Sequence, residues 1–272
     1  MSSLSPALTL PASQLPVVDG VYSTAPRYVS WFARTFPSIA FFVRLTGIVL
    51  RAASKAKWSN YDGEAWTKSS LEVLHALEKV GVEFEITGID QLKQVDGPCL
   101  VIGNHMSTLE TMILPGIIQP IREVTFVVKE ALVTYPIFKH VMRSRNPIAV
   151  SQTDPRADLK LMLSGGLQRL ANGISLVVFP QGERTPAFEP RQFNSIGVKL
   201  ASRAKVPIVP VALQTDAWGR GRIISDFGRI DPSKKVRIAF GSALDVEGRG
   251  VEENETIVRF ICDKLKLWSS VN

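Results

Sequence analysis

The stretch CLVIGNHMSTLETMILPGII, residues 99 to 118, contains the change of pattern on which the fold prediction depends. Cys99–Gly103 is a short apolar run, which is typical of a buried strand. Leu109–Ile118 has the amphipathic character of a helix, and a polar connection separates it from the apolar run. The stretch therefore predicts a strand followed by a helix, which is the repeating unit of an α/β sheet.

The same alternation of short β-rich runs and helical stretches occurs from Gly81 onward. The other predicted strands are Val82–Thr87, Val124–Val128, Ile148–Val150, Ile174–Phe179, Ile208–Leu213 and Val236–Phe240. The other predicted helices in this part are Ala157–Ala171, Phe193–Ala204 and Val251–Trp268. This order predicts an α/β fold with a largely parallel central sheet flanked by helices. Functional groups are then expected beyond the carboxyl ends of the strands.

The chain is expected to fall into three parts. Residues 1–26 are rich in Ser, Pro and Ala and are predicted to be a flexible tail. Residues 27–80 are predicted to form a helical segment that associates with a membrane, with one helix over Glu64–Val80. Residues 81–272 are predicted to form the α/β domain. No uncharged apolar run is long enough to predict a transmembrane helix.

The segment Arg27–Lys57 is apolar but interrupted by cations, and Pro37 should divide it into two helical pieces. Within each piece the arginines are seven residues apart and share a helical face: Arg27 with Arg34, and Arg44 with Arg51. Aromatic bulk opposite a cationic stripe suits a helix that lies in the interface of an anionic bilayer. The alternative is an ordinary amphipathic helix that packs on its own domain.

Composition narrows the classes of partner and cofactor. The formal net charge of +7 favours a polyanion, either nucleic acid or an anionic bilayer. No recognised nucleic-acid motif is present, and cations near the N-terminus alternate with bulky apolar residues, so we expect no nucleic-acid partner. Cys99 and Cys262 match no zinc spacing, and the three histidines form no HExxH motif, so neither a metal nor a bound cofactor is expected.

His105 and Glu110 are the candidate catalytic pair. Imidazole titrates near neutrality, so His105 can take the proton of an attacking hydroxyl and return it. A carboxylate on the other ring nitrogen fixes the tautomer, and Glu110 follows five residues later. The alternative for Glu110 is structural, because the sequence from Ser107 to Glu110 fits the S-x-x-E capping box of a helix start.

A second polar segment, FPQGERTP over residues 179–186, follows the strand Ile174–Phe179. Gly182 lets the backbone approach a ligand closely, and Arg184 offers a planar fork that matches a phosphate or carboxylate. Glu183 is unusual beside an anion site and is interpreted as a residue that orients Arg184. The alternative is a plain surface turn.

Three ordered motifs resemble the phospholipid/glycerol acyltransferase family, which includes the 1-acyl-glycerol-3-phosphate acyltransferases. Asn104-His105 with Glu110 resembles the family's N-H-x-x-x-x-D, and residues 179–185 resemble its F-P-E-G-T-R-[ST] loop. Residues 206–211, VPIVPV, resemble its V-P-[IV]-[VI]-P-V strand, which accounts for prolines in a central strand. Order and separations agree across roughly Val82 to Leu213.

The resemblance implies an O-acyltransferase that moves a fatty acyl group from an acyl-CoA or acyl-carrier-protein thioester to a lysophospholipid hydroxyl. His105 is then the general base and Glu110 its partner. The implied substrate-binding residues are Asn104, Gln181, Gly182, Glu183, Arg184 and Thr185. The implied location is the cytoplasmic side of the membrane, where the protein is peripheral or monotopic and binds the anionic surface through the four arginines.

The chain departs from the family pattern at several positions. Glu110 replaces Asp, Gln181 replaces Glu, and Glu183 replaces Thr. Gln152 stands where the family's second block usually ends in arginine, and three arginines are candidates to replace it: Arg143, Arg145 and Arg156. These changes leave two alternatives open. The acceptor is a different lyso-lipid such as an aminolipid, or the chain is a catalytically silent membrane-binding protein on the same fold.

Overall fold

A computed structural model describes residues 14–135, 138–151, 153–221 and 225–270. One sheet of eight strands runs through the molecule in the order β1-β2-β8-β7-β3-β6-β4-β5. The strands are β1 (Tyr22–Ser23), β2 (Phe84–Thr87), β3 (Leu100–Gly103), β4 (Val124–Lys129), β5 (Ile148–Val150), β6 (Ser175–Val178), β7 (Ile208–Gln214) and β8 (Val236–Phe240). Only the β1–β2 and β7–β8 pairs are antiparallel among the described strands, so the predicted largely parallel α/β sheet is confirmed.

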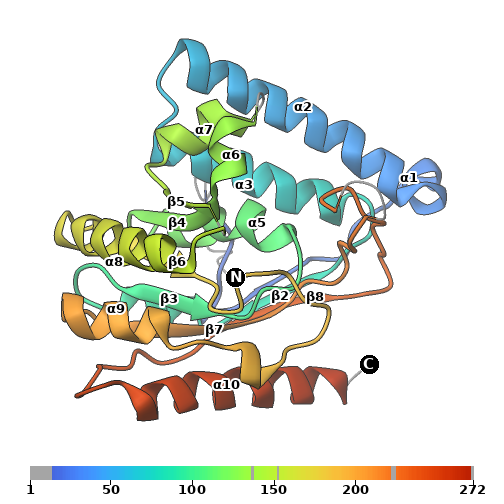
Figure 1. Ribbon diagram of the computed structural model, residues 1–272. Coiled ribbons are helices and arrows are strands. Elements are labelled where there is room, and N and C mark those ends of the chain that lie inside the picture. Colours follow the sequence, from blue (N-terminus) through green and yellow to red (C-terminus); the bar gives the residue numbers. More distant parts are fainter. Residues whose placement is uncertain (1–13, 136–137, 152, 222–224, 271–272) are drawn as a thin grey trace, which may run out of the picture.

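Helices cover the sheet on both faces, with α2 and α3 on one side and α10 on the other (Figure 1). The helices of the first half are α1 (Trp31–Thr35), α2 (Pro37–Trp58), α3 (Gly63–Glu78), α4 (Ile89–Lys93) and α5 (Leu109–Ile118). Those of the second half are α6 (Glu130–Thr134), α7 (Phe138–Ser144), α8 (Pro155–Ala171), the 3₁₀ turn η1 (Pro190–Gln192), α9 (Ile196–Ala204) and α10 (Val251–Ser269). Among the described residues no helix combines the length and the apolar character that crossing a bilayer requires.

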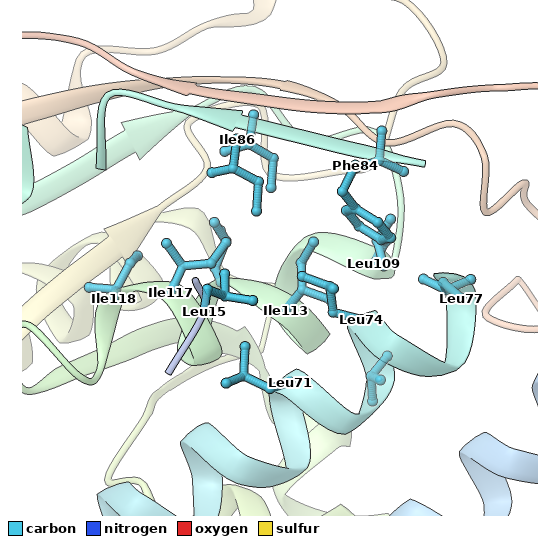
Figure 2. Packing of buried hydrophobic residues seen from close by; sticks show 14 of the residues in the cluster. Leu15, Leu71, Leu74, Leu77, Phe84, Ile86, Leu109, Ile113, Ile117 and Ile118 are labelled. Carbon is cyan, nitrogen blue, oxygen red and sulfur yellow. The ribbon is translucent and has the colours of Figure 1, made fainter. Parts of the chain in front are cut away.

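The core between α3, α5 and β2 fixes the start of α5. Leu109 and Ile113 of α5 lie between Leu74 of α3 and Phe84 of β2, and all four side chains are fully buried (Figure 2). Burying one such side chain stabilises the fold by about 1.5–3 kcal/mol. Because α5 is held on both sides, the polar residues at its first turn have little freedom to move. α3 belongs to the segment 27–80 that is predicted to associate with a membrane, and much of its surface packs on the α/β domain instead of facing outward.

A buried carboxylate attaches the N-terminal segment to α3. Glu78 is fully buried and accepts hydrogen bonds from the hydroxyls of Tyr22 and Thr24, both at 2.6 Å. Its other oxygen bonds Arg27 Nη1 at 2.6 Å and His75 Nδ1 at 2.9 Å. Burial by itself raises the pKa of Glu78, but bonds from His75, Thr24 and Tyr22 and the charge of Arg27 outweigh it, so the pKa lies below its usual value.

The structure differs from two predictions for the N-terminal region. Residues 14–26 are not a flexible tail, because Leu15 and Tyr22 are buried and β1 pairs with β2; residues 1–13 lie outside the described part. Arg27 and Arg34 do not share a helical face, because α1 begins only at Trp31 after the capping residue Ser30. The division at Pro37 is confirmed, since Pro37 is the first residue of α2.

Candidate active site

His105 follows β3 at the carboxyl edge of the sheet. Its ring stacks on Phe179, the residue after β6, with centroids 4.3 Å apart and planes 5° apart. Nδ1 bonds Glu110 Oε2, and 15% of the side-chain surface stays exposed. Nε2 makes no hydrogen bond to any described residue, so it is the ring nitrogen left to exchange a proton with a ligand.

Glu110 makes the contacts that both of its predicted roles require. Its carboxylate is fully buried, and Oε2 bonds His105. Oε1 accepts the backbone N–H of Met106 at 2.9 Å and that of Ser107 at 3.0 Å, which is the reach-back half of a capping box. The hydroxyl of Thr215 also donates to Oε1. These partners compensate the cost of burying a carboxylate, so the acid that holds His105 is itself held.

Thr215 is a site residue that the sequence analysis missed. It directly follows β7, it is fully buried, and its Oγ1 lies 3.0 Å from Ser107 Oγ. The signal for it was available, because polar residues just beyond the carboxyl end of a strand are candidates for such a site.

The 179–186 loop is tied to His105 by the side-chain amide of Gln181 and the backbone N–H of Thr185. The N–H of His105 donates to Gln181 Oε1 at 3.0 Å, and the N–H of Thr185 donates to His105 O at 2.9 Å. Gln181 Nε2 donates to Thr185 Oγ1 at 2.7 Å, which a glutamate at this position cannot do. Gln181 and Thr185 therefore hold the two motifs together.

The turn of this loop places Arg184. Gly182 has a φ of +73°, the left-handed region that favours glycine, and its N–H bonds Phe179 O at 3.1 Å. Glu183 is exposed. The carboxylate that orients Arg184 is instead Asp226, which bonds Nη1 together with the hydroxyl of Thr108. The expectation that Glu183 orients Arg184 is thereby corrected.

Asp226 and its neighbour Ser225 complete the surroundings of Arg184. Ser225 Oγ lies 3.2 Å from Arg184 Nη2, and Thr108 Oγ1 donates to Asp226 Oδ1 at 2.9 Å. The side chains of Arg184 and Asp226 are 24% and 45% exposed. A guanidinium and a carboxylate thus reach solvent side by side, close to Thr108, the residue that precedes α5.

Asn104 directly precedes His105, and its side-chain amide bonds the backbone of a neighbouring strand. It is buried, its Nδ2 donates to Leu213 O at 2.8 Å, and its Oδ1 accepts the N–H of Leu213 at 2.9 Å. Both amide groups are used to join the ends of β3 and β7. The structure thus gives Asn104 a structural role, and its predicted substrate contact stays a prediction.

The arginines proposed for the second block are separated by the fold. Arg145 precedes β5 at the amino ends of the strands, where its carbonyl accepts from Thr125 Oγ1 at 2.7 Å. Arg143 donates through Nε to Val133 O at 2.9 Å. Arg156 follows the carboxyl end of β5, on the edge that carries His105. Gln152 lies outside the described residues. Arg156 thus follows a strand end of the edge that carries His105, and Arg143 is bonded to α6, which follows the carboxyl end of β4 on the same edge.

A family model described as acyltransferase matches residues 83–214, the span that contains the His105 pair and the Arg184 loop and ends one residue before Thr215. This span is an acyltransferase-family domain. A 1-acyl-sn-glycerol-3-phosphate acyltransferase of Pseudomonas aeruginosa is 28% identical to the chain over 170 residues, 62% of each protein. A chloroplastic 1-acyl-sn-glycerol-3-phosphate acyltransferase of Brassica napus, BAT2, is 23% identical over 62% of this chain and 45% of its own. The chain spans 62% or less of the length of these curated relatives.

The fold of the chain is also similar to that of a solved structure. The crystal structure of the 1-acyl-sn-glycerophosphate acyltransferase PlsC from Thermotoga maritima superposes with a TM-score of 0.65, over 84% of this chain and 94% of that one. The two sequences are 16% identical, so this likeness establishes the fold.

Proposed function

We propose that this chain transfers a fatty acyl group from an acyl-CoA or acyl-carrier-protein thioester to the hydroxyl of a lysophospholipid of the 1-acyl-glycerol-3-phosphate type. The observation that carries the proposal is the bond between His105 Nδ1 and the buried Glu110, on the sheet edge that also carries Arg184. The names of the relatives above support this class of reaction.

The residues fit a direct transfer. The acceptor hydroxyl gives its proton to Nε2 of His105 while its oxygen attacks the thioester carbon. A new C–O bond forms, the C–S bond breaks, and the departing thiolate takes the proton back from Nε2. Glu110 stabilises the imidazolium that exists between these two proton transfers. The acceptor itself is the nucleophile, so no serine or cysteine of the protein has to form an acyl intermediate.

Arg184 is the proposed ligand for the acceptor's anionic head group. Its planar fork suits two oxygens of a phosphate, and part of its surface is open to solvent. Asp226 favours a second candidate acceptor, a lyso-aminolipid, because a cationic amine next to an anionic group satisfies both side chains at once.

The proposal includes a membrane surface as the source of acceptor. Large apolar side chains of the α1–α2 region are exposed: Tyr28, Trp31, Phe32, Phe36, Ile39, Val43, Leu50 and Trp58. Arg34, Arg44 and Arg51 lie exposed on the same helices and suit anionic lipid. Arg27 is left out, because its guanidinium bonds Glu78. The proposed place is the cytoplasmic face, where both kinds of acyl thioester occur.

Lipid mass spectrometry tests the proposal most broadly. Purified protein is incubated with mixed lysolipids, including lysophosphatidic acid and a lyso-aminolipid, and with acyl-CoA or acyl carrier protein in separate reactions. The expected product is one lysolipid made heavier by one acyl chain, and none with His105→Ala. Folded protein that acylates no acceptor from either donor contradicts the proposal and favours the catalytically silent alternative.

A further inference from the structure

A cationic groove lies between α2 and α3, on the far side of α3 from the α5 core. It has a volume of about 500 Å³, and its lining includes Arg44 and Arg51 from α2 and His75 and Lys79 from α3. Gly47 lies between the two arginines, where a Cβ atom would meet only Arg51 Nη1, at 3.5 Å. The missing side chain keeps the groove open between the cations.

The charges of this groove are not balanced within it. Its one carboxylate, Glu72, bonds Arg51 at 2.7 Å, and these side chains are 35% and 67% exposed. Arg44 donates to the carbonyl of Ala40 in its own helix, and Lys79 is exposed. Three permanent cations thus face one carboxylate, which makes an anion the complementary ligand. His75 bonds the buried Glu78 through Nδ1, which leaves Nε2 for a ligand.

The position of the groove on α2 indicates where the anion comes from. At 100° per residue, the exposed side chains of Ile39, Val43 and Leu50 form an apolar ridge beside the face that carries Arg44 and Arg51. Val43 lines the cationic groove and also a second groove on the other side of the ridge. In a bilayer interface such a ridge contacts acyl chains, while cations beside it reach the level of the phosphates.

The second groove differs in character, and one of its lining residues, Phe227, directly follows a residue of the candidate active site. It has a volume of about 520 Å³ and is lined by Ile39, Phe42 and Phe227 among others. The ring of Phe227 lies 5.2 Å from that of Phe42, and Phe227 directly follows Asp226, the ion-pair partner of Arg184. The ridge therefore separates a groove suited to a lipid phosphate from a groove suited to an acyl chain.

We propose that the groove between α2 and α3 binds the phosphate of an anionic membrane lipid that is not the acceptor. This lipid orients the protein so that the apolar groove beside Phe227 opens into the acyl-chain layer. The inference rests on the membrane association proposed above. It assigns to Arg44, Lys79 and His75 a ligand separate from the one at Arg184.

Vesicle co-sedimentation without any thioester tests the lipid site apart from acyl transfer. Full-length protein is mixed with phosphatidylcholine vesicles, with or without phosphatidylglycerol. The wild type is expected to prefer the anionic vesicles, and Arg44→Gln with Lys79→Gln should lower that preference roughly tenfold or more. The matched control is Lys199→Gln with Arg203→Gln, at exposed positions of α9. It also removes one lysine and one arginine charge, but far from α2, and should change the preference for anionic vesicles less than about twofold.

Three results overturn the inference: no anionic preference of the wild type, equal losses in both double variants, or displacement by inorganic phosphate beyond that caused by chloride at equal ionic strength. The last result indicates a site for a soluble anion. If the double variant does not fold, as circular dichroism shows, Lys79→Gln alone replaces it, with an expected loss of about threefold to fivefold. If the wild type transfers no acyl group but its preference for anionic vesicles still depends on Arg44 and Lys79, the proposed function fails and the lipid site stands.

Discussion

The guanidinium of Arg184 is bonded to the carboxylate of Asp226, and Thr108 bonds both side chains. The proposed ligand of an anionic head group is therefore already occupied by an anion of the protein. An incoming phosphate has to compete with Asp226 for Arg184, while an acceptor that also carries an amine does not.

Asp226→Asn is expected to lower the KM for a phosphate-bearing acceptor, by about threefold to tenfold, because the amide keeps the hydrogen bond but removes the competing charge. The KM for the thioester should stay the same. Asp216→Asn is the matched control, since Asp216 pairs with Lys234 at 2.7 Å and leaves Arg184 untouched. A raised acceptor KM in Asp226→Asn argues that the carboxylate itself contacts the acceptor.

Glu110→Gln is expected to lower kcat by about 10²-fold or more with a small change in thermal stability. The amide oxygen can still accept hydrogen bonds from the N–H groups of Met106 and Ser107, and the amide nitrogen then faces His105. An amide donor at Nδ1 forces the imidazole proton onto Nε2, which then cannot accept one. Steady-state kinetics and thermal unfolding measure the two effects. Unchanged kcat with a lowered melting temperature leaves Glu110 with the capping role alone.

Thr215→Val keeps the shape of the side chain and removes the hydroxyl that bonds Glu110. We expect kcat to fall about tenfold, because the carboxylate loses a partner and holds His105 less well. Thr215→Ser retains the hydroxyl and should restore most of the rate. Equal rates for the valine and serine variants indicate that Thr215 contributes only packing.

Glu78→Gln tests the attachment of the N-terminal segment through its pH dependence. The folded pKa of Glu78 lies below the ordinary value of 4.5, so its charge stabilises the fold above that pH, and the effect is lost as the pH falls through the folded pKa. Thermal unfolding from neutral pH to about pH 3 should show a stability gap between wild type and variant that closes in acid. A stability gap that stays constant across this pH range contradicts the claim that the charge of Glu78 attaches the N-terminal segment.

Strong periodicity explains why most of the fold was predictable. The bounds of α5, β5 and β8 match the sequence prediction because each is a contiguous apolar or amphipathic run. The short helices α4, α6 and α7, with five, five and seven residues, were not predicted. They are too short for a helical repeat to emerge from the sequence.

The site was predictable only where its residues belong to local motifs. The pairing of His105 with Glu110 follows from a strand end and a helix start five residues apart. Thr215 and Asp226 reach the site from more than a hundred residues further along the chain, so only the folded sheet reveals them. The structural bonds of Asn104 and Gln181 were not predicted, because polar groups in a motif can serve the backbone as well as a substrate.

The most direct test of the central claim is the rate of acyl transfer by His105→Ala, measured beside the wild type with the acceptor and thioester that mass spectrometry identifies. The account predicts a fall in kcat of about 10²–10⁴-fold, with the melting temperature nearly unchanged. A folded His105→Ala protein that transfers the acyl group at a near-normal rate contradicts it.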